Sequence, residues 1–504
     1  MILNGTLQTD GNRATLDDLF RRAGVRHADA RALADPPNTE SLTGRTPQRL
    51  TYAEADRAIS ALAAKLRGLG LQTDTVVAIQ LANTVDSVIA LLGVLRAGMI
   101  AAPLPLLWRE QEMVAALGRI GAKAILTVSR IGATAQAEIA MRVAAELFPI
   151  RYICAFGDDL PDGVMPLEDS FGSLATESFQ PAARLGPAAA HVAAVTFDVT
   201  GEGLVPVARS HNELIAGGLA AFLEGGIAAD STILSAIPLA SFAGIALTIV
   251  PWLLAGGTLS LHHGFDPVAF AEQTRAHAAS IAVLPGPALA PLTDAGLLGA
   301  QIKTILALWR APEQLAAAAP WQGDVALVDI ASFGEVGLLP AKRGSDGLPL
   351  PMPHGAILAP RGASGAIAVA ETLRSEAGTL TLRGAMVPTQ PFPPAAKNTD
   401  EEGPAPDGFV DTGFACRIEP GSGTLVLTAP PAGITAIGFY RFRQSEVEAA
   451  VAAADPGAVV VALPDALLGQ RLASGARVAT ASELQARGFN ALITGAFRPR
   501  GNAA

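Results

Sequence analysis

One segment near the middle of the chain has the layout of a phosphate-binding loop but lacks most of its chemistry. Such a loop needs glycines for close backbone approach, hydroxyl groups that donate hydrogen bonds, and usually a lysine that meets the charge. Thr200, Gly201 and Gly203 are present, whereas lysine is absent and Asp198 and Glu202 stand in the same few residues. Acids that face a polyphosphate repel it. The favoured interpretation is that both acids lie in a solvated turn.

Three other groupings have residue types that could do chemistry. Adjacent Ser210 and His211 suggest a nucleophile with its base, but sequence neighbours need not face each other, and a helix start is the favoured interpretation. His262 and His263 suggest metal ligands, although an adjacent pair at a strand end is more often an exposed turn. Cys416 is a reactive thiol or, more commonly, a small buried apolar residue.

The composition is that of a large protein with more than one domain. The chain has 504 residues, 50% of them hydrophobic and 16% charged, with a net charge of −10. That balance excludes nucleic acid and anionic membranes as general partners, because both need a basic surface. Two cysteines build neither a disulfide framework nor a cysteine-rich metal site, and a reducing cytoplasm is expected. The first residues show no secretory signal pattern.

A run without charged side chains extends over residues 231–261. The run is long enough to cross a membrane. However, proline, serine and glycine divide it into pieces of strand and helix length, which favours a buried strand, helix and strand over a transmembrane segment. The dividing residues are Pro238, Ser241, Pro251, Gly256 and Gly257.

Helices and strands alternate along the first part of the chain, as in a mostly parallel sheet covered by helices. Thr51 and Glu54 form a capping box that begins a helix. The elements that follow are a strand at 76–81, a helix at about 86–98, and strands at 100–104 and 123–128.

The last part of the chain has a different organisation. The proline-rich stretch 391–408 predicts a solvated loop. A strand at 424–428, a helix at 444–453 and a strand at 459–463 follow it, and they predict a small C-terminal lobe.

Residues 51–108, TYAEADRAISALAAKLRGLGLQTDTVVAIQLANTVDSVIALLGVLRAGMIAAPLPLLW, resemble the opening of the adenylate-forming (AMP-binding) superfamily, which includes acyl-CoA synthetases, aryl-CoA ligases and peptide-synthetase adenylation domains. The family's phosphate loop, T-S-G-T-T-G-x-P-K-G, is matched in part by Thr196–Gly201. The resemblance implies that Thr196, Thr200, Gly201 and Gly203 contact ATP phosphates. It also makes Ser210–Leu214 the family's S-H-x-N-L-like helix start.

The resemblance implies an α/β fold with a large N-terminal domain of helix-covered, mostly parallel sheets and a small α+β C-terminal lobe. The division falls just after the family's T-G-D motif, which gives domains at residues 1–414 and 415–504. The motif reads Thr412, Gly413 and Phe414 here. Phenylalanine cannot accept the ribose hydrogen bonds that the aspartate takes, and the family's later arginine falls at about Pro430.

Two further family motifs persist in part. The segment PLASFAG matches one that lines the acid pocket, so the resemblance places Ser241, Phe242 and Gly244 beside the substrate. ASFGEVG matches Y-G-x-T-E-x-G, and Glu335 aligns with a glutamate that helps to hold magnesium. The alternative is that Glu335 is a surface or capping carboxylate.

Lysine is the most damaging loss. The chain has none after Lys397, whereas family members use one near the chain end while charge builds during adenylation. Arg498 or Arg500 would have to supply that charge, and Arg498 is our candidate, although a guanidinium differs in shape from an ammonium group. The cation nearest to the degenerate loop is Arg209.

Two functions follow from these observations. The first is ATP- and Mg²⁺-dependent activation of a fatty or aryl carboxylic acid to an acyl-adenylate, with transfer to the thiol of CoA or of a phosphopantetheine-bearing acyl carrier protein, at weakened activity. The second is a catalytically inactive relative that binds an acyl group, a carrier protein or an active paralogue. Family resemblance favours the first, and the motif losses favour the second. The resemblance also implies a homodimer.

Overall fold

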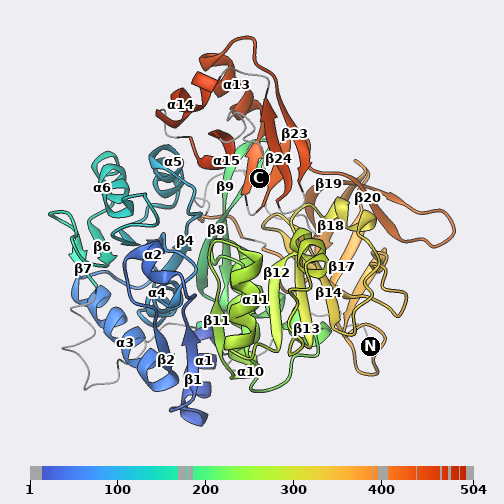
Figure 1. The fold of residues 1–504 in the computed structure, drawn as a ribbon, viewed down its shortest axis with the longest axis horizontal. Coiled ribbons are helices and arrows are strands. Elements are labelled where there is room, and N and C mark those ends of the chain that lie inside the picture. The colour runs from blue at the N-terminus through green and yellow to red at the C-terminus, as the bar shows by residue number, and fades with distance from the viewer. Residues whose placement is uncertain are drawn as a thin grey trace.

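The computed structural model describes residues 14–167, 179, 186–388, 390–394, 407–438, 440–465, 468–474, 478–486 and 489–494. Two helix-covered sheets and an antiparallel sheet form a large domain, and a small α+β lobe lies against it (Figure 1). The α/β fold with a smaller C-terminal lobe, predicted from the sequence, is therefore confirmed.

The first sheet is mostly parallel and has the strand order β7-β6-β5-β3-β4-β8-β9. The predicted capping box of Thr51 and Glu54 begins its first helix. Only β9 runs antiparallel to its neighbour. The strands are β3 (Val76–Ile79), β4 (Ile100–Pro103), β5 (Ala124–Val128), β6 (Tyr152–Phe156), β7 (Met165–Pro166), β8 (Val192–Thr200) and β9 (Gly203–Ser210). Helix α3 (Tyr52–Gly68) precedes β3, and the helices between the strands are α4 (Val85–Arg96), α5 (Glu110–Ile120) and α6 (Gln136–Glu146).

The second sheet has the order β15-β14-β13-β12-β10-β11-β1-β2, and its central strands are parallel. Its strands are β1 (Arg31–Ala34), β2 (Arg49–Thr51), β10 (Ile233–Ser235), β11 (Leu259–Leu261), β12 (Ile281–Pro285), β13 (Thr304–Trp309), β14 (Ala326–Phe333) and β15 (Gly337–Lys342). The associated helices are α1 (Leu16–Arg26), α2 (Thr39–Thr43), α8 (His211–Glu224), α10 (Val250–Ala255), α11 (Pro267–Ala276) and α12 (Leu289–Asp294).

The third sheet is antiparallel, and the small lobe follows it. The sheet contains β16 (Gly355–Ala359), β17 (Ile367–Arg374), β18 (Thr379–Arg383), β19 (Val410–Ile418) and β20 (Leu425–Ala429). The lobe contains β21 (Ile434–Ile437), β22 (Tyr440–Arg443), α13 (Gln444–Ala454), β23 (Val460–Asp465), β24 (Gly469–Ser474), α14 (Val478–Ala486) and α15 (Ala491–Thr494).

The division after residue 414 stays a prediction. β19 continues to Ile418 and pairs with β20, so the first strand outside the third sheet begins at Ile434. Residues 395–406 of the predicted proline-rich loop lie outside the described part of the chain.

The uncharged run folds as the sequence predicts, into β10, a helical stretch and β11. The helical stretch consists of α9 (Phe242–Gly244), a π-helical turn (Ile245–Ile249) and α10, and it is buried against α8. Within the described residues, no helix combines the length and the apolar character that crossing a membrane requires. Close packing of helices inside the large domain explains the hydrophobicity of this segment.

Gly218 makes that close packing possible. A Cβ atom at this position would lie 2.3 Å from Val250 Cβ and 2.5 Å from the Ala246 carbonyl oxygen. We expect Gly218→Ala to lower the free energy of unfolding by about 1–3 kcal/mol, because overpacking forces the backbones apart. Gly68→Ala is the matched control, since no atom lies within 4 Å of a Cβ atom there. Chemical denaturation of both variants measures the difference, and equal stabilities would contradict the close contact.

Candidate functional site

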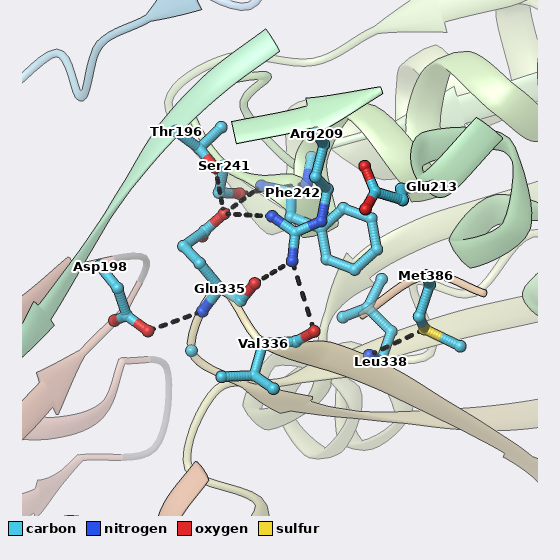
Figure 2. Close-up of polar contacts among 12 residues, drawn as sticks. Thr196, Asp198, Arg209, Glu213, Ser241, Phe242, Glu335, Val336, Leu338 and Met386 are labelled. Atoms are coloured by element: carbon cyan, nitrogen blue, oxygen red, sulfur yellow. Dashed lines mark hydrogen bonds and ion pairs between the residues drawn. The ribbon is translucent and has the colours of Figure 1, made fainter. Parts of the chain in front are cut away.

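Four residues that the sequence singled out lie together where three elements converge, namely Thr196, Asp198, Arg209 and Glu335. The elements are the β8–β9 hairpin, the turn between β14 and β15, and β22 of the small lobe. Figure 2 shows Thr196, Asp198 and Arg209 from the hairpin around Glu335 from the turn. The turn follows the carboxyl end of β14, which is the edge of a parallel sheet where ligands usually bind. The elements therefore build a candidate site at the expected place.

The segment predicted as a degenerate phosphate loop is a tight hairpin. β8 and β9 stay paired as far as Thr200 and Gly203, so only Gly201 and Glu202 form the turn. The Thr200 hydroxyl donates to the Gly203 carbonyl at 3.3 Å and accepts from the Glu202 amide at 3.2 Å. Gly203 has a φ of 123°, which favours glycine. The backbone groups of a phosphate cradle are thus used for strand pairing.

Asp198 is not in a solvated turn, so the favoured sequence interpretation is wrong for this residue. Its side chain is 9% exposed. Oδ2 accepts from the Glu335 amide at 2.8 Å, and Oδ1 accepts from the Val199 amide at 2.8 Å and from Arg441 Nη1 at 2.5 Å. Side chains two apart on a strand share a face, so Asp198 points inward with Thr196. Glu202, in the turn, is exposed as expected.

Glu335 is buried and already hydrogen-bonded. Its Oε2 accepts from the Thr196 hydroxyl at 2.6 Å and from the Phe242 amide at 2.8 Å. The same oxygen lies 3.8 Å from Arg209 Nη1. Burial raises the pKa of Glu335, while Arg209 and Arg310 act in the opposite direction. The alternative of a surface carboxylate is wrong, because Glu335 is buried beside Arg209. The role of magnesium ligand stays a prediction.

Arg209 is the cation that Glu335 neutralises. Its Nη2 donates to the Glu335 and Val336 carbonyls, and its guanidinium lies 3.8 Å from the centre of the Phe242 ring. Burial lowers the pKa of Arg209 to about 10. Nε and Nη1 have no hydrogen-bond partner among the described residues. The sequence did contain a signal for a buried ion pair, because Arg209 stands in an otherwise apolar strand. The sequence analysis did not use this signal.

The predicted acid-pocket residues lie beside the same cluster. Ser241 begins α9, where its hydroxyl accepts from the Gly244 amide at 3.1 Å and from Arg310 Nη2 at 2.6 Å. A side chain at Gly244 would place Cβ 1.9 Å from the Pro238 carbonyl oxygen, so glycine is required there. Arg310 directly follows β13, and its place at a strand's carboxyl end was the signal that sequence reasoning missed.

Small cavities border this cluster. One of about 20 Å³ lies between the large domain and the small lobe, and Arg310 and Gly438 are among its lining residues. Another of about 10 Å³ is lined in part by Arg310, Pro430 and Arg441. Each has room for about one water molecule. A third, of about 20 Å³, is apolar and borders the Pro238–Ala240 segment.

The motif equivalent to T-G-D contributes packing. Phe414 is buried and meets Phe333 edge-on, with ring centres 5.4 Å apart. The Thr412 hydroxyl donates to the Leu380 carbonyl at 2.8 Å. Arg498, the predicted catalytic cation, lies outside the described residues.

The Ser210-His211 pair begins a helix, as predicted. The Ser210 hydroxyl accepts from the Glu213 amide, and the Glu213 carboxylate accepts from the Ser210 amide. His211 Nδ1 accepts from the Leu16 amide at 3.3 Å. Cys416 is a buried free thiol, which agrees with the apolar interpretation.

The expected exposed turn at His262 and His263 is wrong, because His262 is buried, His263 is half-buried, and both rings are hydrogen-bonded. The His262 ring is hydrogen-bonded to Gln273 at 2.9 Å, and His263 Nδ1 accepts from the Asn83 amide at 3.1 Å. Asn83, which lies between β3 and α4 of the first sheet, also donates to the His262 carbonyl at 3.0 Å, so the pair is held between the two sheets. The described residues contain no group of three potential metal ligands around them.

Two helix-covered sheets with a small lobe at the carboxyl ends of their strands define the adenylate-forming class of enzyme fold. Residues 20–320 match the family model described as AMP-binding enzyme, so this chain belongs to that family. Its relatives include the 2-hydroxy-7-methoxy-5-methyl-1-naphthoate–CoA ligase of Streptomyces carzinostaticus. The two are 26% identical in an alignment 473 positions long, gaps included, which covers 86% of this chain and 81% of the ligase.

Two further likenesses cover different amounts of the chain. A long-chain-fatty-acid–CoA ligase of Yersinia pestis is 34% identical over 122 residues, but these span only 24% of this chain and 20% of that ligase. The amide bond synthetase McbA from Marinactinospora thermotolerans has a similar fold, with a TM-score of 0.71, 19% identity, and coverage of 96% of this chain and 94% of McbA.

The internal role of Glu335 can be tested through stability. We expect Glu335→Ala to lower the free energy of unfolding by about 3–5 kcal/mol, because removing one partner of a buried pair leaves Arg209 without its countercharge. Glu202→Ala is the matched control and should change stability by no more than about 0.5 kcal/mol. Urea denaturation measures both changes, and a Glu335→Ala protein as stable as the control would refute the role.

The half-buried ring of His263 predicts a pH dependence of stability. Burial and the neighbouring His262 lower the pKa of His263 from 6.5 to about 4. The folded protein therefore excludes a proton that the unfolded chain binds, so this contribution to stability is present above pH 6.5 and is lost as the pH falls towards 4. The loss amounts to at most about 3 kcal/mol.

We expect His263→Gln to reduce the stability difference between pH 6.5 and pH 4.5, because glutamine keeps an acceptor but does not titrate. His354→Gln, at an exposed position, is the control. Denaturant midpoints at the two pH values provide the measurement. An unchanged difference in His263→Gln would count against a neutral His263 imidazole in the folded protein.

Proposed function

We propose that this chain keeps the fold of an adenylate-forming acid–CoA ligase without carrying out ATP-dependent activation, and that it acts as an acyl-binding protein. The observation that carries the proposal is the position of the Asp198 carboxylate. It is bound by the Glu335 amide and by Arg441, between the large domain and the small lobe. A negative charge of the chain itself therefore occupies the junction where the family resemblance would place phosphate.

The residues that would contact ATP do not fit it in this arrangement. The Thr196 hydroxyl is bound to Glu335, and the Thr200 hydroxyl is bound within its own turn. The turn itself contains only Gly201 and Glu202, and Glu202 adds a second negative charge. A polyphosphate would have to displace a buried ion pair and separate the two strands of the hairpin.

The arginines around Glu335 disfavour the binding of a magnesium ion. A divalent cation bound to Glu335 would lie among the guanidinium groups of Arg209, Arg310 and Arg441, and like charges at short range repel strongly where water is excluded. Burial already raises the pKa of Glu335, so its ionised form depends on the opposing effect of Arg209 and Arg310. In the proposed function, Glu335 therefore serves as the structural countercharge of Arg209.

An acyl group is the ligand with the best support among the partners that the resemblance implies. The apolar cavity beside Pro238, Leu239 and Ala240 lies next to the segment that corresponds to the acid pocket. At about 20 Å³ it holds no acyl chain as it stands, so binding would require it to widen. Largely apolar walls with few polar anchors are typical of such sites.

A second candidate function is a weakened acid–thiol ligase. It is favoured by the likeness to a naphthoate–CoA ligase, which extends over 86% of this chain. In that case ATP, Mg²⁺, a small carboxylic acid, and CoA or a carrier-protein thiol would be the reactants. Glu335 and Arg498 would be the catalytic candidates, and the hairpin would have to rearrange on binding. A homodimer is a proposal under either function.

Calorimetry and pyrophosphate release separate the two candidates. We expect no binding heat with millimolar ATP and Mg²⁺, and no acid-dependent pyrophosphate release with a panel of fatty and aryl acids in the presence of CoA. The naphthoate–CoA ligase, assayed in parallel with its own acid, verifies the assay. Acid-dependent release by this chain that disappears in Thr196→Val would overturn the proposal in favour of the ligase.

A further inference from the structure

The Asp198 carboxylate is held in the manner of a bound oxoanion. Its two oxygens accept from three donors on three different segments. These donors are the Val199 amide on β8, the Glu335 amide in the β14–β15 turn, and Arg441 on β22. Backbone amides combined with a guanidinium form a common arrangement for carboxylate and phosphate recognition. We infer that these donors form an oxoanion site, that Asp198 fills it as a tethered ligand, and that a free carboxylate can occupy it once this side chain is removed.

The backbone around the carboxylate is shaped for it. Gly334, in the β14–β15 turn, has a φ of 56°, in the left-handed region. A Cβ atom there would lie 2.2 Å from Asp198 Oδ2 and 2.3 Å from Arg441 Nη1. Glycine therefore leaves the space in which the carboxylate and the guanidinium meet. Without the Asp198 side chain, the same space would be bordered by two amide donors and a cation.

The site also joins the two parts of the molecule. Asp198 and Glu335 belong to the large domain, whereas Arg441 belongs to the small lobe. The side chains of Asp198 and Arg441 are only 9% and 10% exposed, so bulk water screens their attraction weakly. An anion at this position therefore holds the lobe against the domain. Removing the anion leaves Arg441 near Arg310, which borders the same small cavity, and the repulsion between the two cations disfavours the closed arrangement.

This inference rests on the proposed function and deepens it, since it names the group that takes the place of a bound anion. The two can nevertheless fail separately. ATP turnover by the unaltered chain would overturn the proposed function, whereas the tethered-anion site is tested without nucleotide, by the response of Asp198 variants to acetate.

The experiment is rescue of Asp198→Ala by sodium acetate. Hydrogen exchange of the peptide that covers Ile434–Arg443 reports on the attachment of the lobe, and the peptide that covers α8 is the internal reference. We expect this exchange to be at least about tenfold faster in Asp198→Ala than in the unaltered chain, because hydrogen bonds to charged groups are lost. Acetate should slow it several-fold relative to sodium chloride at equal ionic strength.

Two matched variants control for general effects of salt and of mutation. Asp198→Asn removes the charge but fills the space, so it should show faster exchange without a specific acetate effect. Glu202→Ala removes an exposed acid from the same hairpin and should behave as the unaltered chain. Equal effects of acetate and chloride on Asp198→Ala would refute the oxoanion site.

A variant on the other side of the pair covers the case in which Asp198→Ala does not fold. Arg441→Gln keeps the Asp198 carboxylate and removes the cation. It should likewise speed exchange over Ile434–Arg443 by about tenfold, and acetate should not reverse the change. Exchange at the unaltered rate in Arg441→Gln would show that the ion pair does not hold the lobe, and would overturn the inference.

Discussion

The balance of buried charge around Glu335 is the constraint on which the rest of this site depends. Arg209 lies on an apolar strand and needs a countercharge, because an isolated buried ion is costly. The carboxylate of Glu335 supplies this countercharge. The Thr196 hydroxyl and the Phe242 amide donate hydrogen bonds to the same carboxylate. The hairpin, the β14–β15 turn and the start of α9 are therefore fixed to one another by a single acidic side chain.

The fold explains why these charges gather where they do. Parallel strands end at a common edge, and β12, β13 and β14 direct the residues that follow them to that edge. In an open sheet this is the place for a ligand. Here Arg310 and Glu335 lie at that edge and pair with groups of the chain itself, so a family architecture built around a ligand is completed by internal contacts.

Much of the fold could be predicted, and the site only in part. Local patterns were sufficient to predict β3, α4 and β5 from the sequence, because apolar periodicity and helix capping are properties of short segments. Thr196 and Glu335 could be brought together through the family motifs. The inward direction of Asp198 could not be predicted, because it depends on the pairing of β8 with β9 up to the turn. Arg441 was missed because its partner lies 243 positions away in the chain.

The two-residue turn at Gly201 and Glu202 has a consequence for protein engineering. The strands on both sides of this turn are paired up to Thr200 and Gly203. Under the proposed function, a lysine introduced at a single position would leave this pairing in place. A designed nucleotide site would therefore first need a longer connection between β8 and β9, which frees backbone amides for a phosphate group.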